Sequence, residues 1–414
     1  MRIRNYRFVR IKLPKTLLAL PGLLLILMVP AEGKAQGCIA VRGGGQCSLN
    51  HLHDFEAEMM GEAPTGEWQV SFAHRWLHSF RHFAGTKENT TRIPNDTEVI
   101  NDSHFIDIGL NYQISSRYSA SLFLPYVNSD RSSKYEHGDP ADGRHYIGAE
   151  GIADMRASVY GWIIDPAEAP KGNLQLGFGL KLPTGDYRAT DTFQGPRGPE
   201  THFVDQSIQP GDGGWGFTTE FYTYHLLSDR LSVYAQGFYL FNPEGINGVS
   251  TEHGNGVRGK TYQALLNGAA GGDPVAAARL ANAQALGFAN YHSLEDVMSI
   301  TDQYLARAGA SYLLDEKHGI VLSLGARVEG IPAEDALGSL DGFRRPGFTI
   351  SVEPGISITR ERWSAGVAVP VAVLRDRVAS VADERWGRIT GLGTVKGDAA
   401  FADYTINTYF TYRF

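Results

Sequence analysis

The chain has 414 residues and a formal net charge of −7, and 38 Lys and Arg residues face 45 Asp and Glu residues. This acidic balance argues against a nucleic-acid partner, because such partners are bound by basic surfaces. Beyond the first 35 residues, no segment approaches the roughly 18 consecutive apolar residues of a membrane helix. The 48 Gly, 19 Tyr and 20 Phe residues suit either a soluble all-β protein or an outer-membrane barrel.

Residues 1–35 predict a secretory signal peptide. Six basic residues precede position 16 without any acid, and an apolar run over 17–29 is interrupted by Pro21 and followed by small residues. Cleavage near Ala35 would remove seven basic residues and one acidic residue, and so shift the net charge from −7 to −13. We therefore expect an exported protein without a helical anchor.

Residues 36–66 show no clear strand pattern and are expected to form a periplasmic tail or a plug inside the barrel. They contain the chain's two cysteines, Cys38 and Cys47, and an oxidising compartment favours a disulfide between them. Two alternatives are lipidation of Cys38, whose flanking sequence lacks the expected Leu, and a zinc site with His51 and His53, whose spacing fits no zinc template. We expect neither a metal nor a cofactor.

Residues 67–414 predict a β-barrel domain. Twelve segments alternate between apolar and polar residues and reach the roughly 9 to 11 residues that a tilted strand needs to cross a bilayer. They cover 68–78, 104–114, 117–128, 152–164, 173–183, 215–227, 230–242, 302–314, 319–330, 348–359, 363–374 and 399–414. Long and short connections alternate between them. We therefore predict an all-β, transmembrane, antiparallel up-and-down barrel of about twelve strands, with both termini periplasmic and long extracellular loops.

The longest connection, 243–301, contains a helix signal. Asp273 is a suitable N-cap, Pro274 suits the first turn, and Gly287 follows an Ala-rich body. A short helix is expected there, which could cover the outer mouth, fold inward or decorate the surface.

The last strand carries the clearest alternation. Its even positions are expected to face lipid: Ala400, Ala402, Tyr404, Ile406, Thr408, Phe410, Tyr412 and Phe414. Phe401 and Tyr409 are aromatic residues on the opposite, inward face. A terminal Phe after such a pattern resembles the sorting signal of bacterial outer-membrane barrels. The expected partners are therefore outer-membrane lipid and the barrel assembly machinery, and the expected location is the outer membrane of a Gram-negative cell.

The same alternation places charged side chains inside the barrel. The predicted lumen residues are Arg75, Asp107, Arg156, Lys181, Glu220, Arg307, Arg327, Glu329, Glu353, Asp403 and Arg413. They could line a polar permeation path. They could equally pair with one another and fill a narrow interior, because buried charges require partners.

Catalytic motifs are weak in this sequence. A membrane-embedded hydrolase would need a Ser beside a His on the outer wall, and His78 and His82 lie where the first strand should leave the membrane, without a matching motif. The Gly-rich segment 42–45 lacks the Lys-Ser/Thr of a phosphate-binding loop. We therefore expect no enzyme.

Several short motifs resemble the outer-membrane proteins grouped with the meta-pathway of phenol degradation. These motifs lie at 151–154 (GIAD), 180–186 (LKLPTGD), 211–213 (GDG), 351–355 (SVEPG), 369–373 (VPVAV) and 397–404 (GDAAFADY). The resemblance implies movement of hydrophobic or aromatic compounds across the outer membrane, similar in role to FadL channels. Asp154, Asp212 and Asp398 precede strands and are expected to cap backbone amides.

The sequence thus favours a passive channel or transporter for the uptake or efflux of small molecules, hydrophobic or aromatic compounds among them. The second hypothesis is a structural barrel with a filled lumen and no transport. A membrane-embedded hydrolase is the third.

Overall fold

The computed structural model describes residues 35–36, 65–134, 143–195, 198–251, 265–285, 297–338, 342–390, 393–394 and 396–414. These residues belong to one compact unit, Lys34–Phe414. Cys38 and Cys47 lie outside the described residues, as do the expected signal peptide, apart from Ala35, and nearly all of the expected tail or plug.

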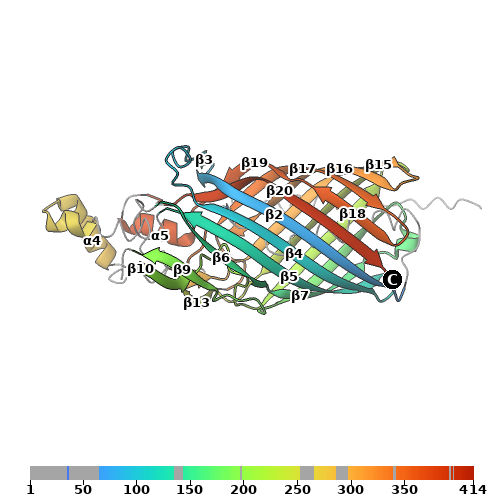
Figure 1. Ribbon diagram of the computed structural model, residues 1–414, viewed down its shortest axis with the longest axis horizontal. Helices are drawn as coiled ribbons and strands as arrows, with labels where there is room; N and C mark the ends of the chain where they lie inside the picture. Colours follow the sequence, from blue (N-terminus) through green and yellow to red (C-terminus); the bar gives the residue numbers. More distant parts are fainter. Residues whose placement is uncertain are drawn as a thin grey trace, which may run out of the picture. The chain divides into compact units, whose positions relative to one another are not determined.

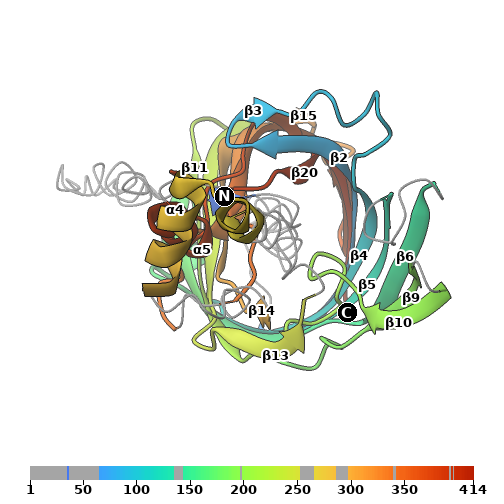
Figure 2. The same cartoon turned by 90° about the vertical axis from the view of Figure 1, so that its left-hand side faces the viewer.

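Twelve antiparallel strands, one of which is divided into two segments, make up the wall of a closed barrel (Figure 1). In order around the wall they are β2 (Trp68–Ala84), β4 (Ile100–Gln113), β5 (Tyr118–Ser133), β7 (Met155–Trp162), β8 (Gly172–Leu182), β11 (Gly216–Leu226), β12 (Leu231–Phe241), β15 (Gln303–Asp315), β16 (Ile320–Pro332), β17 (Gly347–Thr359), the pair β18 (Trp363–Ala368) and β19 (Val371–Asp376), and β20 (Ala399–Arg413). β20 pairs with β2 and closes the barrel. The predicted antiparallel barrel of twelve strands is confirmed, and Figure 2 shows the wall end-on.

The two faces of the wall differ as the alternation predicts. On β8, Leu176, Phe178 and Leu180 are 46–47% exposed on the outside, and on β20 Tyr404, Phe410 and Tyr412 are 37–44% exposed. Inward positions are mostly polar, small or aromatic and are buried. The wall therefore combines an apolar outer surface with a polar interior.

Two of the expected strands are interrupted, and both interruptions lie beside a proline. β6 (His145–Ile152) and β7 are separated at Ala153 and Asp154, opposite Pro125 of β5, and β18 and β19 are separated at Val369 and Pro370, opposite Pro354 of β17. Proline has no N–H to donate to a neighbouring strand, so the ladder breaks there. The expected strand 152–164 and the expected strand 363–374 are corrected accordingly.

The end with long connections contains more regular structure than expected. β5 and β6 extend into the predicted loop 129–151. Smaller elements are β1 (Ala35–Gln36), β3 (Lys87–Glu88), the hairpin β9 (Thr190–Gly195) and β10 (Gly198–Phe203), the pair β13 (Ile246–Ser250) and β14 (Val297–Ser299), and the short 3-10 helix Pro166–Glu168. The predicted helix in the longest connection is present as α4 (Pro274–Ala285).

A second helix, α5 (Val381–Thr390), was not expected. Ser380 and Asp383 form a capping box: the amide of Ser380 donates to Asp383 Oδ2 over 2.7 Å, and the amide of Asp383 donates to Ser380 Oγ over 3.0 Å. The spacing Ser-x-x-Asp is the sequence signal that could have identified this helix.

The alternation of the last strand fails near its start. Pairing of β20 with β2 shifts register between Leu77 and Ser79 and again between Ser79 and Arg81. Ala400, expected to face lipid, is only 1% exposed and packs with Phe83 and with Phe401, which is itself 2% exposed, so burial no longer alternates here. A bulge adds one residue to a strand and so reverses the faces beyond it.

Candidate functional site: a charge ladder across the barrel

Eight of the predicted lumen residues meet in the middle of the barrel. We name them the charge ladder: Arg75 on β2, Asp107 on β4, Arg156 on β7, Glu220 on β11, Arg307 on β15, Arg327 and Glu329 on β16, and Glu353 on β17. Each is at most 8% exposed. Four guanidinium groups thus face four carboxyl groups in a buried interior, where unpaired charges would be strongly unfavourable.

One half of the charge ladder is held by direct hydrogen bonds. Nη2 of Arg75 donates to both carboxylate oxygens of Glu329 over 3.0 and 3.1 Å, and Nη2 of Arg327 donates to Glu329 over 2.9 Å. Nη1 of Arg307 donates to Glu353 over 2.8 Å, and Arg327 lies 3.8 Å from the other oxygen of Glu353. Each of the two glutamates is therefore shared between two arginines.

The other half is looser. Nη1 of Arg156 lies 3.6 Å from Glu220, whose oxygens accept hydrogen bonds from Thr218 over 2.9 Å and Tyr160 over 3.2 Å. Asp107 interacts electrostatically with Arg156 and Arg75 and connects the two halves. Positive and negative groups therefore alternate along the whole ladder.

The Arg75–Glu329 pair reaches into the interior of the barrel. β2 and β16 are not neighbours, because β20, the β18 and β19 pair, and β17 lie between them on that side of the wall. A hydrogen-bonded ion pair between such strands reaches across part of the interior at this level. The sequence prediction of inward charges identified these residues, but it could not show which of them join.

Aromatic rings lie against two of the guanidinium groups. Cζ of Arg156 is 5.5 Å from the ring centre of Phe123 on β5 and 6.0 Å from that of Phe238 on β12. Cζ of Arg307 is 5.3 Å from the ring centre of Tyr234. Phe123 and Phe238 are 1% and 3% exposed, so these cation–π contacts are buried and stronger than exposed ones. No motif identifies these rings in the sequence, although both lie at inward positions of their strands.

Inward tyrosines lie flat over glycines of neighbouring strands. A Cβ added at Gly177 would come within 2.6 Å of the Tyr160 ring, and one at Gly366 would come within 2.5 Å of the Tyr409 ring. The hydroxyl oxygen of Tyr234 would lie 2.8 Å from a Cβ added at Gly325 of β16. Any side chain at these glycines would push the rings further into the interior, so the glycines set how much space the rings leave.

The remaining three predicted lumen residues lie apart from the charge ladder. Lys181 pairs with Asp212 over 2.6 Å at the end of β8. Asp403 is half-exposed beside the bulges of β20 and accepts from Arg81 and Arg375, each over 2.7 Å. Nη2 of Arg413 donates to the backbone oxygen of Glu361 over 3.3 Å at the end with short turns.

A second group of ion pairs lies among the long connections. We name Arg131, Asp205 and Arg345 the mouth clamp. Arg345 donates to both oxygens of Asp205 over 2.7 and 2.6 Å, and Arg131, on the inner face of β5, lies 3.6 Å from the same carboxylate. All three are largely buried. The clamp therefore fixes two connecting segments to the wall, and no short sequence motif indicates it.

A neighbouring pair fixes the same connections. Arg344 donates to Asp335 over 2.9 and 2.6 Å and to Ser299 over 2.8 Å. Asp335 also accepts from the amide of Asp302 over 2.9 Å. Segments that precede β15 and follow β16 are thus joined to each other.

The aspartates that precede strands cap backbone amides, as expected for Asp154 and Asp212. Asp154 accepts from the amides of Gly185 and Asp212, both over 3.0 Å, and Asp212 accepts from the amide of Gly214 over 3.0 Å. Gly185 and Gly211 are so close that a Cβ on either would meet the other's backbone within 2.7 Å. The Gly-Asp motifs therefore allow the segments around Asp154, Gly185 and Gly211 to pack closely at the end of the wall with long connections.

Asp398 instead binds side chains. Its oxygens accept from Arg92 over 2.5 Å each, and Nδ1 of His82 lies 3.4 Å away. Burial by itself would raise the pKa of Asp398, but the hydrogen bonds from His82 and Arg92 outweigh it and hold the pKa well below its ordinary value. Asp398 lies in the connection before β20 and ties that connection to the one that follows β2.

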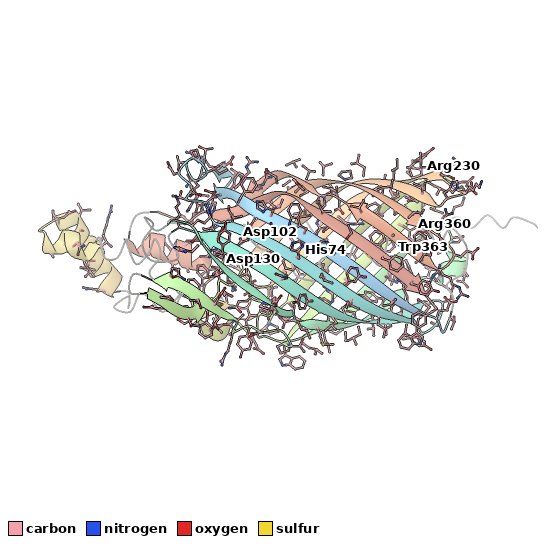
Figure 3. All side chains as sticks on the ribbon, viewed as in Figure 1. His74, Asp102, Asp130, Arg230, Arg360 and Trp363 are labelled. Atoms are coloured by element: carbon pink, nitrogen blue, oxygen red, sulfur yellow. The ribbon has the colours of Figure 1, made fainter. Side chains whose placement is uncertain are left out.

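Histidines gather on the outer wall near the end with long connections. His74 and His104 are within 2.9 Å of each other, and His78 contacts Asp102 over 2.9 Å; Figure 3 labels His74 and Asp102. Within the described part of the chain, no group of three or more His, Cys, Asp or Glu residues is arranged to hold a metal ion. His82 is buried and contacts the backbone of Val99.

No protein-family model matches the chain, and no curated protein matches its sequence. Solved outer-membrane structures resemble it. A channel from Pseudomonas putida F1 has a TM-score of 0.50 at 12% identity, with 86% of this chain and 97% of that chain covered. The β domain of the Bordetella autotransporter BrkA reaches 0.41 at 10% identity, covering 84% and 100%. A toluene transporter from Ralstonia pickettii reaches 0.36 at 9% identity, covering 86% and 92%. The chain thus has the fold of an outer-membrane β-barrel.

Proposed function

We propose that the protein is an outer-membrane channel through which small molecules, hydrophobic or aromatic compounds among them, pass without an energy source. The observation that carries this proposal is a closed twelve-strand wall with an apolar outer face and a polar inner face. The similar structure from Pseudomonas putida F1 is described as an outer-membrane channel. A channel also accounts for inward tyrosines that lie against glycines of neighbouring strands, where any larger residue would displace the rings.

The proposal includes export and orientation. Residues 1–35 act as the signal peptide, residues 36–66 form a periplasmic tail or plug, and residues 67–414 form the barrel. The short turns face the periplasm and the long connections face outward, as in bacterial barrels generally. The strand that ends at Phe414 is read by the barrel assembly machinery. The short Gly- and Pro-rich motifs support membership in the phenol meta-pathway group of outer-membrane proteins.

A filled structural barrel is the second candidate, and the charge ladder favours it. An ion pair that reaches across part of the interior, with both side chains at most 10% exposed, would narrow a permanently open pore. A channel with this ladder must separate Arg75 from Glu329, or pass solutes beside them. The two candidates therefore differ in what happens when the pair is removed.

Conductance measurements separate the candidates. Purified protein in planar lipid bilayers is compared with the double variant Arg75→Gln/Glu329→Gln, which removes one positive and one negative charge together and so leaves the net charge of the ladder unchanged. A channel gives small currents in the wild type and currents several-fold larger in the double variant. Arg230→Gln is the matched control, since Arg230 is 52% exposed at a short turn. Absence of current in all three proteins would establish the filled barrel instead.

A further inference from the structure

The outer face of the neighbouring strands β2, β4 and β5 changes from apolar to polar part of the way along the wall. Toward the short turns, the outward side chains are apolar and 43–46% exposed, as at Phe72, Ile108 and Leu122. Toward the long connections, they are polar or aromatic: His74, Trp76 and His78 on β2, Asp102 and His104 on β4, and Asn128 and Asp130 on β5. Figure 3 shows His74, Asp102 and Asp130 together on one side of the wall.

This change occurs at the level expected for lipid headgroups. On β5, Asn128 follows Tyr118, which lies beside a short turn, by ten positions. At about 3.3 Å per residue and a strand tilt of about 40°, this segment covers about 25 Å across the membrane. The apolar band of an outer-membrane barrel has the same height of about 25 Å. Side chains at the level of Asn128 and beyond it therefore lie beside headgroups rather than acyl chains.

Asp102 holds the rings of this outer face together. Nε1 of Trp76 donates to Asp102 Oδ1 over 3.1 Å, Nδ1 of His78 lies 2.9 Å from Oδ2, and Nε2 of His104 lies 3.6 Å from Oδ1. The rings of His74 and His104 stack with centres 5.2 Å apart, and those of Trp76 and His78 stack with centres 6.2 Å apart. We name these five residues the ring platform. The side chains of His78, Asp102 and His104 are 39–46% exposed, so the platform is open to a molecule beside the wall.

The chemistry of the ring platform suits a sugar ring. The flat faces of Trp and His can pack against the C–H groups of a sugar. Carboxylate, amide and imidazole groups can bind its hydroxyl groups as donors or acceptors. Asn128 and Asp130 lie on β5 opposite His104 and Asp102 and are exposed, so they add an amide and a carboxylate beside the rings. A lipid without a sugar would use neither the stacking surface nor this set of hydroxyl-binding groups.

We propose that the ring platform, with Asn128 and Asp130, binds the sugar headgroup of an outer-leaflet glycolipid of the lipid A type. The acyl chains of that lipid lie on the adjoining apolar surface of β2, β4 and β5. The site is on the outside of the wall and does not depend on an open interior, so the inference goes beyond the proposed channel function. It uses only the proposed orientation, which places the long connections and the platform on the side of the outer leaflet.

Native mass spectrometry of the purified protein in a sugar-free polyoxyethylene detergent tests this proposal. Glucosyl-dioleoylglycerol and dioleoyl-phosphatidylglycerol are added in equal amounts, so that the two lipids share their acyl chains and differ in the headgroup. The wild type is expected to retain the glucosyl lipid about tenfold better, the effect of one stacking contact together with hydroxyl hydrogen bonds. Lipid A, measured in the same way, should also be retained better than phosphatidylglycerol.

Two leucine variants test the platform itself. Trp76→Leu and His104→Leu each remove a ring, while leucine is readily accepted on the lipid-facing side of a barrel. Each is expected to bring the preference for the glucosyl lipid close to one, and the second serves if the first does not fold. Trp363→Leu is the matched control, since Trp363 is an outward ring that stacks on Phe410 at the end with short turns. This control should keep the wild-type preference.

The results distinguish failure of this inference from failure of the proposed function. A wild-type preference close to one, or a preference that persists in both Trp76→Leu and His104→Leu, overturns the sugar site. Retention of lipid A no better than phosphatidylglycerol overturns lipid A as the occupant. Absence of current in planar bilayers would overturn the channel and leave these lipid measurements unaffected.

Discussion

The charge ladder and the mouth clamp are both buried networks of Arg and carboxylate groups, but they are built on different supports. Every member of the ladder projects from a barrel strand, and its partners are fixed by the register of the wall. The clamp joins one strand residue, Arg131, to Asp205 and Arg345 in connecting segments. Separation of the ladder therefore requires side chains to change partners within a rigid wall, whereas the clamp can open by movement of its connections.

The largest expected effect comes from removal of a shared group in the ladder. Arg327→Met leaves Glu329 and Glu353 each with one arginine fewer in a buried site, and should lower the free energy of unfolding by about 3 to 5 kcal/mol. Urea unfolding in detergent micelles measures this loss. Arg230→Met, at an exposed and weakly paired arginine, is the control and should change stability by less than about 0.5 kcal/mol. An equal loss of unfolding free energy in the two variants would show that the buried ladder contributes no more to stability than an exposed ion pair.

A smaller effect is expected at the mouth clamp. Asp205→Asn leaves Arg131 and Arg345 near a neutral side chain and should lower the free energy of unfolding by about 2 kcal/mol. The loss is smaller than in the ladder because the connections can move and let water reach the arginines. Asp96, which contacts Lys134 and Arg144 while 54% exposed, offers a matched carboxylate with two cationic partners. Asp96→Asn should leave the unfolding midpoint unchanged. If Asp205→Asn is as damaging as Arg327→Met, the clamp is as rigid as the ladder.

Glycine variants compare the interior wall with a connection. Gly366→Ala places a methyl group within 2.5 Å of the Tyr409 ring and should cost about 1 to 2 kcal/mol through overpacking. Gly397→Ala is the control, since nothing lies within 4 Å of its added Cβ. The thermal stability of both variants is measured by the change in gel migration that accompanies unfolding on heating. Equal stability of the two variants would show that Tyr409 can move without cost.

The smallest effect concerns pH at the loop end of the wall. Because the pKa of Asp398 is held below its unfolded value near about 4, the stability it contributes is complete above about pH 4 and is lost as the pH falls through the folded pKa. The loss should approach about 1 kcal/mol per pH unit below pH 4. Asp398→Asn should remove this component from unfolding curves measured between pH 5 and pH 2. An unchanged pH slope would contradict the role given to His82 and Arg92.

The barrel was predictable from the sequence because alternation specifies faces directly. The same parity that exposes Leu176 and Phe178 also turns Arg156 and Glu220 inward. The partners within the ladder were not predictable, since Arg75 and Glu329 are 254 residues apart and meet only through closure of the wall. The alternation of inward and outward positions also fails near a bulge, as at Ala400. It gives no information about the connecting segments that carry Asp205 and Arg345.

The balance of the charge ladder has a consequence for electrical behaviour. A membrane potential acts on a protein through the charge that moves along the field, at about 2.3 kcal/mol per elementary charge and 100 mV. The ladder's four arginines and four carboxylates have no net charge when all are ionised, so its displacement as a unit would transfer none. Movement of the whole ladder should therefore depend little on voltage, whereas separation of individual pairs should respond to ions and solutes that compete for them.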